Sequence, residues 1–180
     1  MIQTDERTVS LKKGTEETPR VILFVCTGNT CRSPMAAALF NDMMRPREVC
    51  SACADEMDIR MENAVARSAG LYANEGDPIT QEAARALREA GVRPVPGYDY
   101  NAHRARTVTA DMMAEAHRVI AISAAHAMEL TFRFPEYAAK ISTMPMDIAD
   151  PFGRGDAVYR ECLMQLRYCL QLLMAEESTQ

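Results

Sequence analysis

A cysteine and an arginine separated by five residues are the strongest chemical signal in the sequence. Cys26 and Arg32 bracket the polar segment TGNTC at residues 27–31. An arginine offers a planar fork of donors to phosphate oxygens, and a cysteine thiolate is a nucleophile suited to phosphoryl transfer. A positively charged loop favours the thiolate form of Cys26. The spacing therefore predicts a phosphate-binding loop in which Cys26 and Arg32 are catalytic.

The residues between this pair suit an anion cradle. Successive backbone N–H groups in a tight loop form an anion-binding concavity, and a following helix N-terminus adds partial positive charge. We expect Gly28 to adopt a positive φ and let the backbone approach the anion, while Asn29 tolerates the left-handed region. The expected phosphate-binding residues are Thr27, Gly28, Asn29, Thr30, Cys31 and Arg32.

The flanking sequence predicts a strand, a loop and a helix in that order. The apolar run VILFV at residues 21–25 is typical of a strand buried on both faces. Ser33 suits a helix N-cap and Pro34 the first helical position, so a helix is expected to about residue 44. Without this placement, Cys26 would simply be a buried cysteine followed by an ordinary polar turn.

The rest of the chain alternates between strand and helix patterns. Residues 45–65 are interpreted as a helical excursion or insertion, and residues 92–108 as a loop. Strands that alternate with helices predict an α/β fold with a parallel sheet covered on both faces. The further strands are expected at 65–69, 118–122 and 140–143, and the further helices at 81–90, 109–116, 124–134 and 156–175.

Length, composition and charge exclude several classes of protein. With 180 residues, 48% hydrophobic and 25% charged, the chain fits one globular domain. A net charge of −5 without a basic stripe argues against nucleic-acid partners, and no apolar run approaches the roughly 20 residues of a membrane span. Residues 1–19 are expected to be a flexible, polar N-terminal extension to a domain over 20–180. Without an apolar signal segment, a cytoplasmic protein with reduced thiols is expected.

The segment VCTGNTCRSPMA resembles the catalytic loop of the low-molecular-weight phosphotyrosine phosphatase family. The resemblance covers roughly residues 20–177, with further landmarks in SAG at 68–70, HRAR at 103–106 and the Asp-Pro pair at 150–151. It implies a flavodoxin-like three-layer sandwich with a four-stranded parallel sheet and helices on both faces. It also implies that Cys26 attacks phosphorus and forms a phosphocysteine.

The same resemblance implies roles for residues outside the loop. Asp150 would protonate the leaving group and then deprotonate the hydrolytic water, and the two steps do require an acid and then a base at one place. Taken alone, an Asp-Pro pair is usually a turn. Ser33 would stabilise the thiolate, and Asn29, Ser68 and His103 would brace the loop. His117 and His126 show no partner pattern and are assigned no role.

Thr30 and Phe152 are expected to shape the substrate pocket. Tyrosine-specific members of the family usually carry isoleucine or leucine in place of Thr30 and an aromatic pair after the Asp-Pro, where this chain has Phe152 and Gly153. The loop and the DPFG segment resemble the protein arginine phosphatase branch. Because a threonine hydroxyl can accept from a guanidinium N–H, phosphoarginine is the favoured substrate. Phosphotyrosine is the alternative, with Thr30 then a neutral substitution.

The cysteines raise three further questions. Cys26 and Cys31 flank one short loop, so either a reversible disulfide protects Cys26 or Cys31 merely packs beneath the loop. The six cysteines are Cys26, Cys31, Cys50, Cys53, Cys162 and Cys169. The C-x6-C pair on the last expected helix is either a core stripe or a relay like that of arsenate reductases. The C-x2-C pair lacks the second pair that a zinc site needs.

No metal or cofactor is expected. The expected partners are phosphorylated protein substrates, with phosphate and other oxyanions as inhibitors, and neither nucleic acid nor membrane. A non-catalytic phosphate-binding module is disfavoured because Cys26, Arg32 and Asp150 are all present.

Overall fold

The computed structural model describes residues 19–45 and 63–177, and its centre is a four-stranded parallel sheet. The central strand β1 (Arg20–Cys26) pairs with β2 (Ala64–Gly70) along one side and with β3 (Arg118–Ala121) along the other. β3 also pairs with β4 (Ile141–Thr143), which gives the order β2-β1-β3-β4. The expected parallel sheet is confirmed.

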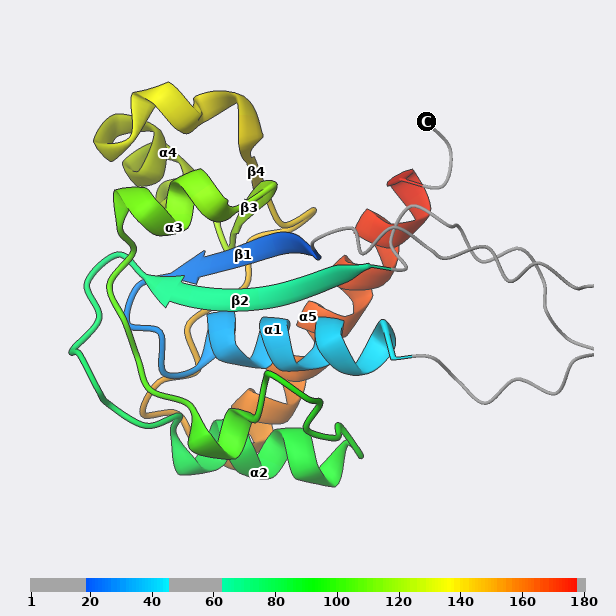
Figure 1. The fold of residues 1–180 in the computed structure, drawn as a ribbon. Helices are drawn as coiled ribbons and strands as arrows, with labels where there is room; N and C mark the ends of the chain where they lie inside the picture. The colour runs from blue at the N-terminus through cyan, green and yellow to red at the C-terminus, as the bar shows by residue number, and fades with distance from the viewer. Residues whose placement is uncertain (1–18, 46–62, 178–180) are drawn as a thin grey trace, which may run out of the picture.

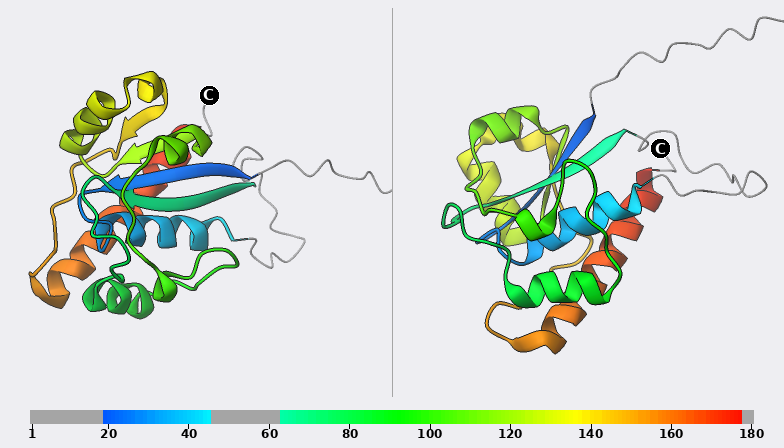
Figure 2. Two further views of the ribbon diagram at one scale, coloured as in Figure 1. Left: turned by 60° about the vertical axis from the view of Figure 1, so that its left-hand side comes forward. Right: turned by 60° about the horizontal axis from the view of Figure 1, so that its bottom comes forward.

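Helices cover both faces of this sheet (Figures 1 and 2). One layer contains α1 (Arg32–Met43), α2 (Gln81–Glu89) and α5 (Gly155–Glu177). The opposite layer contains α3 (Ala110–Glu115) and α4 (Ala124–Arg133). Two short 3₁₀ helices, Tyr100–Ala102 and Pro135–Lys140, lie in connections where no helix was expected. The three-layer α/β architecture matches the expected flavodoxin-like fold.

The alternating side chains of β1 explain its unbroken apolar run. Ile22 and Phe24 belong to the core that contains α1, α2 and α5, whereas Leu23 and Val25 belong to the core under α3 and α4. All four side chains are buried. Because a strand between two helical layers has no polar face, every position in this run is apolar.

Hydroxyl caps begin three of the helices. Thr80, Thr109 and Ser123 each accept a hydrogen bond from the backbone N–H three residues ahead. The expected cap of the first helix is wrong: α1 begins at Arg32, and its N-cap position is Cys31, which makes no side-chain cap bond. The Ser33 hydroxyl is instead occupied by groups of the preceding loop.

Two expectations fall on residues that the structure does not describe. The N-terminal extension lies, up to residue 18, outside the described residues. The same holds for residues 46–62, which contain Cys50, Cys53 and most of the expected helical excursion. No helix among residues 19–45 and 63–177 is both long and apolar enough to cross a membrane.

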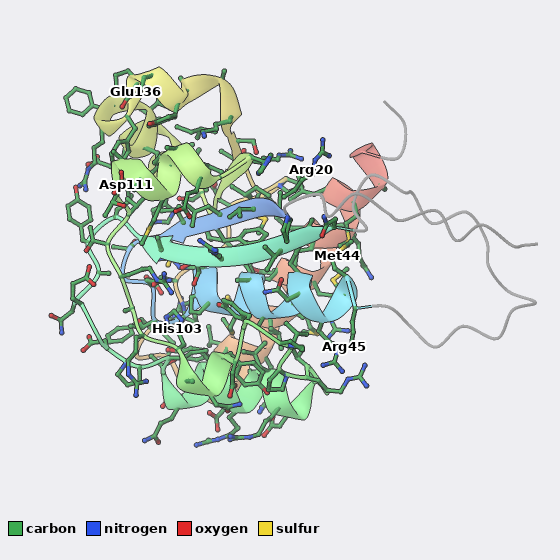
Figure 3. The ribbon with its side chains drawn as sticks, viewed as in Figure 1. Arg20, Met44, Arg45, His103, Asp111 and Glu136 are labelled. Carbon is green, nitrogen blue, oxygen red and sulfur yellow. The ribbon has the colours of Figure 1, made fainter. Side chains whose placement is uncertain are left out.

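The carboxyl ends of β1, β2 and β3 meet at one edge of the sheet. The chain order places β2 and β3 on opposite sides of β1, so the connections after β1 and β3 diverge there. Open parallel sheets bind ligands at such a switch point. Figure 3 shows His103 toward this end of the molecule, with Arg20, Met44 and Arg45 toward the other.

Candidate active site

The loop after β1 is built around one buried hydroxyl. Cys26, the last residue of β1, places its Sγ 3.0 Å from the Oγ of Ser33 in the first turn of α1. The same Oγ accepts from Asn29 Nδ2 at 2.9 Å and donates to the Ala69 carbonyl oxygen at 3.1 Å. Ser33 is fully buried. One hydroxyl therefore links the cysteine, the loop and the end of β2.

The left-handed residue of the loop is Asn29, with φ of 57°. The expectation of a positive φ at Gly28 is wrong, since its φ lies outside the left-handed region and a Cβ there would meet only Thr30 Oγ1, at 3.8 Å. Asn29 can adopt this conformation because its side chain is bonded at both ends. Its Nδ2 donates to Ser33, and its Oδ1 accepts from the Arg106 backbone N–H at 3.0 Å.

His103 bonds the loop directly, whereas the Ser68 hydroxyl contacts Tyr98 and not the loop that it was expected to brace. The Nε2–H of His103 donates to the Asn29 carbonyl oxygen at 2.7 Å, and burial lowers the pKa of His103, so the ring stays neutral. Ser68 Oγ lies 3.4 Å from the hydroxyl of Tyr98, which donates to the carbonyl oxygen of Pro34 in α1. Burial raises the pKa of Tyr98 to about 12, so this phenol remains a donor.

Gly70 makes room for the loop. A Cβ built on Gly70 would lie 2.6 Å from the carbonyl oxygen of Thr27 and 3.0 Å from the backbone nitrogen of Asn29. Both atoms are backbone, so neither can move aside cheaply. The sequence marked Gly70 as a strand end and a family landmark but did not show this steric role, which appears only when β2 is placed beside the loop.

Arg32 and Asp150 meet across the loop. Arg32 NH2 donates to Asp150 Oδ2 at 2.6 Å and to Thr27 Oγ1 at 3.3 Å, while NH1 donates to the Ile148 carbonyl oxygen at 3.3 Å. The Arg32 guanidinium is buried, whereas the Asp150 side chain is 49% exposed. The other Asp150 oxygen accepts from the Phe152 backbone N–H at 3.2 Å. Asp150 is thus oriented at both oxygens and still accessible from solvent.

A cleft of about 560 Å³ opens over the loop. One side is formed by the loop itself, another by the segment between β2 and α2, and the third by the Asp-Pro segment before α5. Among the described residues lining it, Arg32 supplies positive charge, while Asp77, Glu82 and Asp150 supply carboxylates. The lining comprises Cys26, Thr27, Gly28, Thr30, Cys31, Arg32, Tyr72, Asn74, Asp77, Pro78, Ile79, Thr80, Gln81, Glu82, Asp150 and Phe152.

Two aromatic side chains stand at the rim of this cleft. Phe152 is 67% exposed, as expected for a pocket wall. The second, Tyr72, comes from the segment after β2, where no pocket residue was expected. Its ring lies 4.3 Å from the Arg133 guanidinium carbon, and its hydroxyl donates to Glu129 at 2.9 Å. Tyr72 is therefore held against α4.

The remaining described cysteines are buried in the protein core. Cys31 Sγ lies 3.3 Å from the Tyr159 hydroxyl and 3.6 Å from the hydroxyls of Thr30 and Thr80. Cys162 and Cys169 lie on the inward face of α5, which confirms the core-stripe interpretation. Burial raises the pKa of Cys162 to about 12, so it stays a thiol and is unsuited to a relay. The described residues contain no group of three or more potential metal ligands.

The sequence missed His126. Its Nε2 lies 2.9 Å from Thr27 Oγ1, and its Nδ1 lies 2.7 Å from Ser123 Oγ. The ring is buried, on the first turn of α4. The sequence did contain a feature that could have placed His126 at the site. His126 follows β3 closely, and residues just after β3 lie beside the loop after β1 at the switch point of the sheet.

Comparisons with known proteins agree with this geometry. The model for the family described as "Low molecular weight phosphotyrosine protein phosphatase" matches residues 21–180. A protein-arginine-phosphatase from Geobacillus stearothermophilus is 33% identical over 169 residues, which cover 90% of this chain and 99% of that protein. The solved structure of the YwlE arginine phosphatase from Geobacillus stearothermophilus has a TM-score of 0.72 at 33% identity and covers 89% of this chain and 94% of its own. The solved structure of a low molecular weight protein tyrosine phosphatase from T. tengcongensis has a TM-score of 0.71 at 33% identity. The match covers 87% of this chain and 99% of that one.

Proposed function

Because this chain belongs to the low-molecular-weight phosphotyrosine protein phosphatase family, we propose that it hydrolyses phosphoarginine in proteins through a phosphocysteine at Cys26. The observation that carries the proposal is the meeting of Arg32 and Asp150 in the cleft that Cys26 lines. A nucleophile, an anion clamp and a proton donor at one place are the groups that a two-step phosphoryl transfer requires.

In the first step, the Cys26 thiolate attacks phosphorus. The loop 27–31 and Arg32 hold the phosphoryl oxygens, and the Arg32 guanidinium exchanges its bond to Asp150 for one to the substrate. The S–P bond forms while the P–N bond breaks, and the bonding pair goes to the leaving nitrogen. Asp150, in its protonated form, gives its proton to that nitrogen and arginine leaves.

In the second step, the same carboxylate acts as a base. Asp150 takes a proton from a water molecule, whose oxygen attacks phosphorus. The S–P bond breaks, its electron pair returns to Cys26 as a thiolate, and inorganic phosphate leaves. The 49% exposure of Asp150 supports this role, because both the leaving group and water can reach it.

The Ser33 hydroxyl can donate a hydrogen bond to the Cys26 thiolate. Its hydroxyl has one proton, which points to the Ala69 carbonyl oxygen in this structure, with the sulfur at 3.0 Å. A charged sulfur is a stronger acceptor than a neutral carbonyl. The proton therefore turns to Cys26 when the thiol ionises, and the Asn29 amide continues to donate to the same oxygen.

The walls of the cleft favour a cationic leaving group. The Thr30 hydroxyl can accept from a guanidinium N–H, and Asp77 and Glu82 place carboxylates at the rim. The 33% identity to an arginine phosphatase supports the same choice. Phosphotyrosine is the second candidate, since Tyr72 and Phe152 at the rim could flank a phenyl ring.

Phosphate release from a protein carrying phosphoarginine tests the proposal. Wild-type protein should release phosphate, and Cys26→Ser should not, because a serine hydroxyl is not ionised at neutral pH. Arg32→Lys should lose roughly 10- to 150-fold in kcat/KM, because an ammonium cannot reproduce the fork of hydrogen bonds. Arg160→Lys, on an exposed arginine of α5 paired with Glu89, is the matched control and should behave as wild type. Equal phosphate release by Cys26→Ser and wild type would overturn the mechanism.

The reaction also defines the setting and the inhibitors that we propose. Cys26 must be a free thiol, which fits a reducing compartment such as the cytoplasm. The catalytic domain is proposed to span residues 20–180. Phosphorylated proteins are the proposed partners, and phosphate or other oxyanions should compete with them for the loop and Arg32.

A further inference from the structure

We propose that His126 is a positioning residue for phosphoryl transfer: its imidazole fixes the Thr27 hydroxyl, which in turn holds the Arg32 guanidinium at the phosphate-binding loop. The inference rests on the proposed function, because it concerns how the phosphate clamp of that same site is held. His126 would touch no substrate atom; it would act through Thr27.

The Nδ1 side of the His126 ring is fixed by Ser123, the N-cap residue of α4. Ser123 Oγ accepts from the His126 backbone N–H at 3.4 Å and also lies 2.7 Å from the ring Nδ1. One hydroxyl therefore holds both the backbone and the side chain of the same residue. Since the ring is also buried, its direction is set before any ligand binds. The free end of the ring, Nε2, points at the loop after β1.

The far end of the ring meets Arg32 at a shared oxygen. Thr27 Oγ1 lies 2.9 Å from His126 Nε2 and accepts from Arg32 NH2 at 3.3 Å. The NH2 group of Arg32 carries two hydrogens, and its second bond goes to Asp150 Oδ2. Both hydrogens are thus used, and one of the two acceptors is a hydroxyl that His126 orients. Thr27 lies on the cleft surface, so only a few contacts hold its side chain in place.

The charge of the ring agrees with this arrangement. Burial lowers the pKa of His126, and the neighbouring Arg32 lowers it further, while Asp150 and Asp147 oppose the shift. These charged groups come from α1 and from the segment between β4 and α5. A neutral ring can serve Thr27 as donor or as acceptor, and either arrangement leaves an oxygen lone pair for Arg32. No second positive charge then competes with Arg32 at that oxygen.

The experiment compares His126→Gln with His126→Met, using p-nitrophenyl phosphate as substrate. The two replacement side chains are similar in size, but only glutamine can form a strong hydrogen bond to Thr27. We expect His126→Met to lose roughly 2- to 12-fold in kcat with little change in KM, because the clamp acts mainly in the transition state. His126→Gln should recover most of that loss. His117→Gln is the control, since His117 accepts from the Val21 backbone N–H far from the cleft.

A double-mutant cycle with Thr27→Val and His126→Met tests whether His126 acts through Thr27 or only stabilises the fold. Thr27→Val removes the shared oxygen, so adding His126→Met to it should cause no further loss of kcat. The inference would be overturned if the loss of kcat in the double variant equalled the product of the two single losses. A wild-type kcat in His126→Met would overturn it as well. If His126→Met does not fold, the test passes to Thr27→Val alone. This variant must then show the roughly 2- to 12-fold loss in kcat that was expected of His126→Met. A wild-type kcat in Thr27→Val would overturn the inference. An inactive wild type would instead refute the proposed function.

Discussion

The Arg32 guanidinium and the Asp150 carboxylate are in contact at 2.6 Å, although 118 positions separate them in the chain. The two groups proposed for phosphate binding and proton transfer are therefore paired with each other. A phosphoryl group bound by Arg32 would take the place of Asp150 on the guanidinium. The Asp150 carboxyl group would then be released toward the leaving group.

Asp150→Asn should slow hydrolysis most for poor leaving groups. An amide cannot donate a catalytic proton to a departing atom, but p-nitrophenolate needs little protonation to leave. We expect kcat/KM on phenyl phosphate, which reports the first step alone, to fall at least about 10-fold more than kcat/KM on p-nitrophenyl phosphate, from the usual 10²- to 10⁴-fold contribution of such catalysis. Steady-state kinetics on the two esters measure this difference.

The matched control is Asp156→Asn, which removes an exposed carboxylate bound to Arg85 near the same segment. It should leave both kcat/KM values unchanged. Equal losses of kcat/KM for Asp150→Asn on the two esters would contradict the role of Asp150 as an acid in the first step.

Gly70→Ala should impair catalysis as well as stability. The added methyl group would meet the Thr27 carbonyl oxygen at 2.6 Å and force the loop away from β2. Such overpacking costs about 1–3 kcal/mol, so we expect a lower Tm and a reduced kcat/KM. Gly97→Ala is the control: its φ is +82° and nothing lies within 4 Å, so it should lower Tm through backbone strain without changing kinetic constants. Unchanged kcat/KM in Gly70→Ala would show that the loop tolerates the shift.

Peroxide should inactivate the protein reversibly. The Cys26 thiolate is oxidised to a sulfenic acid, and the Cys31 thiolate then attacks that sulfur, forming a disulfide and releasing hydroxide. Cys31 must leave its contact with the Tyr159 hydroxyl to do so. A reductant should restore wild-type activity but not that of Cys31→Ser, in which Cys26 proceeds to irreversible forms. Mass spectrometry showing a sulfinic acid at Cys26 and no Cys26–Cys31 linkage in wild type would reject this switch.

Acid should destabilise the fold below about pH 6.5, before carboxylates titrate. Burial lowers the pKa of both His103 and His126 in the folded state. The unfolded chain then binds more protons than the folded chain as pH falls through the usual histidine range near 6.5. The free energy of unfolding therefore decreases on acidification and is retained above that range. Thermal melts at pH 7.5 and 5.5 measure the effect.

Variants at two histidines resolve the source of this pH dependence. His126→Gln should flatten the change in Tm between pH 7.5 and 5.5, because one of the two buried imidazoles is gone. His117→Gln removes an exposed imidazole instead and is the control for the loss of a histidine side chain. A wild-type slope in His126→Gln would mean that His126 is not a source of the acid sensitivity.

Much of the fold followed from local patterns. β1 sits between two helical layers, so its sequence is a continuous apolar run that is readable without any tertiary information. Thr80 and Thr109 cap their helices through an oxygen that acts within three residues, so these helix starts are local features of the sequence. The meeting of Arg32 and Asp150 was expected only through the family resemblance, since no local rule relates residues so far apart in the chain.

What the sequence missed depends on distant parts of the chain. The positive φ expected at Gly28 is absent, whereas Asn29, expected to tolerate the left-handed region, adopts it because contacts with Ser33 and Arg106 select it. Ser33 caps no helix because its hydroxyl is bonded to the loop and to β2. His126 had no visible partner along the chain, since Thr27 lies 99 positions away. All three errors came from local rules that tertiary hydrogen bonds overrode.

Substrate choice is the central claim, and kcat/KM on matched phosphoarginine and phosphotyrosine peptides tests it most directly. Thr30→Ile removes the hydroxyl proposed to accept from the guanidinium, at a cost of about 1–3 kcal/mol, or roughly 5- to 150-fold in rate. Thr30→Ser keeps the hydroxyl and serves as the control. The account predicts that wild type and Thr30→Ser prefer the phosphoarginine peptide and that Thr30→Ile shifts the ratio toward phosphotyrosine. A wild-type protein that strongly prefers the phosphotyrosine peptide would contradict the account.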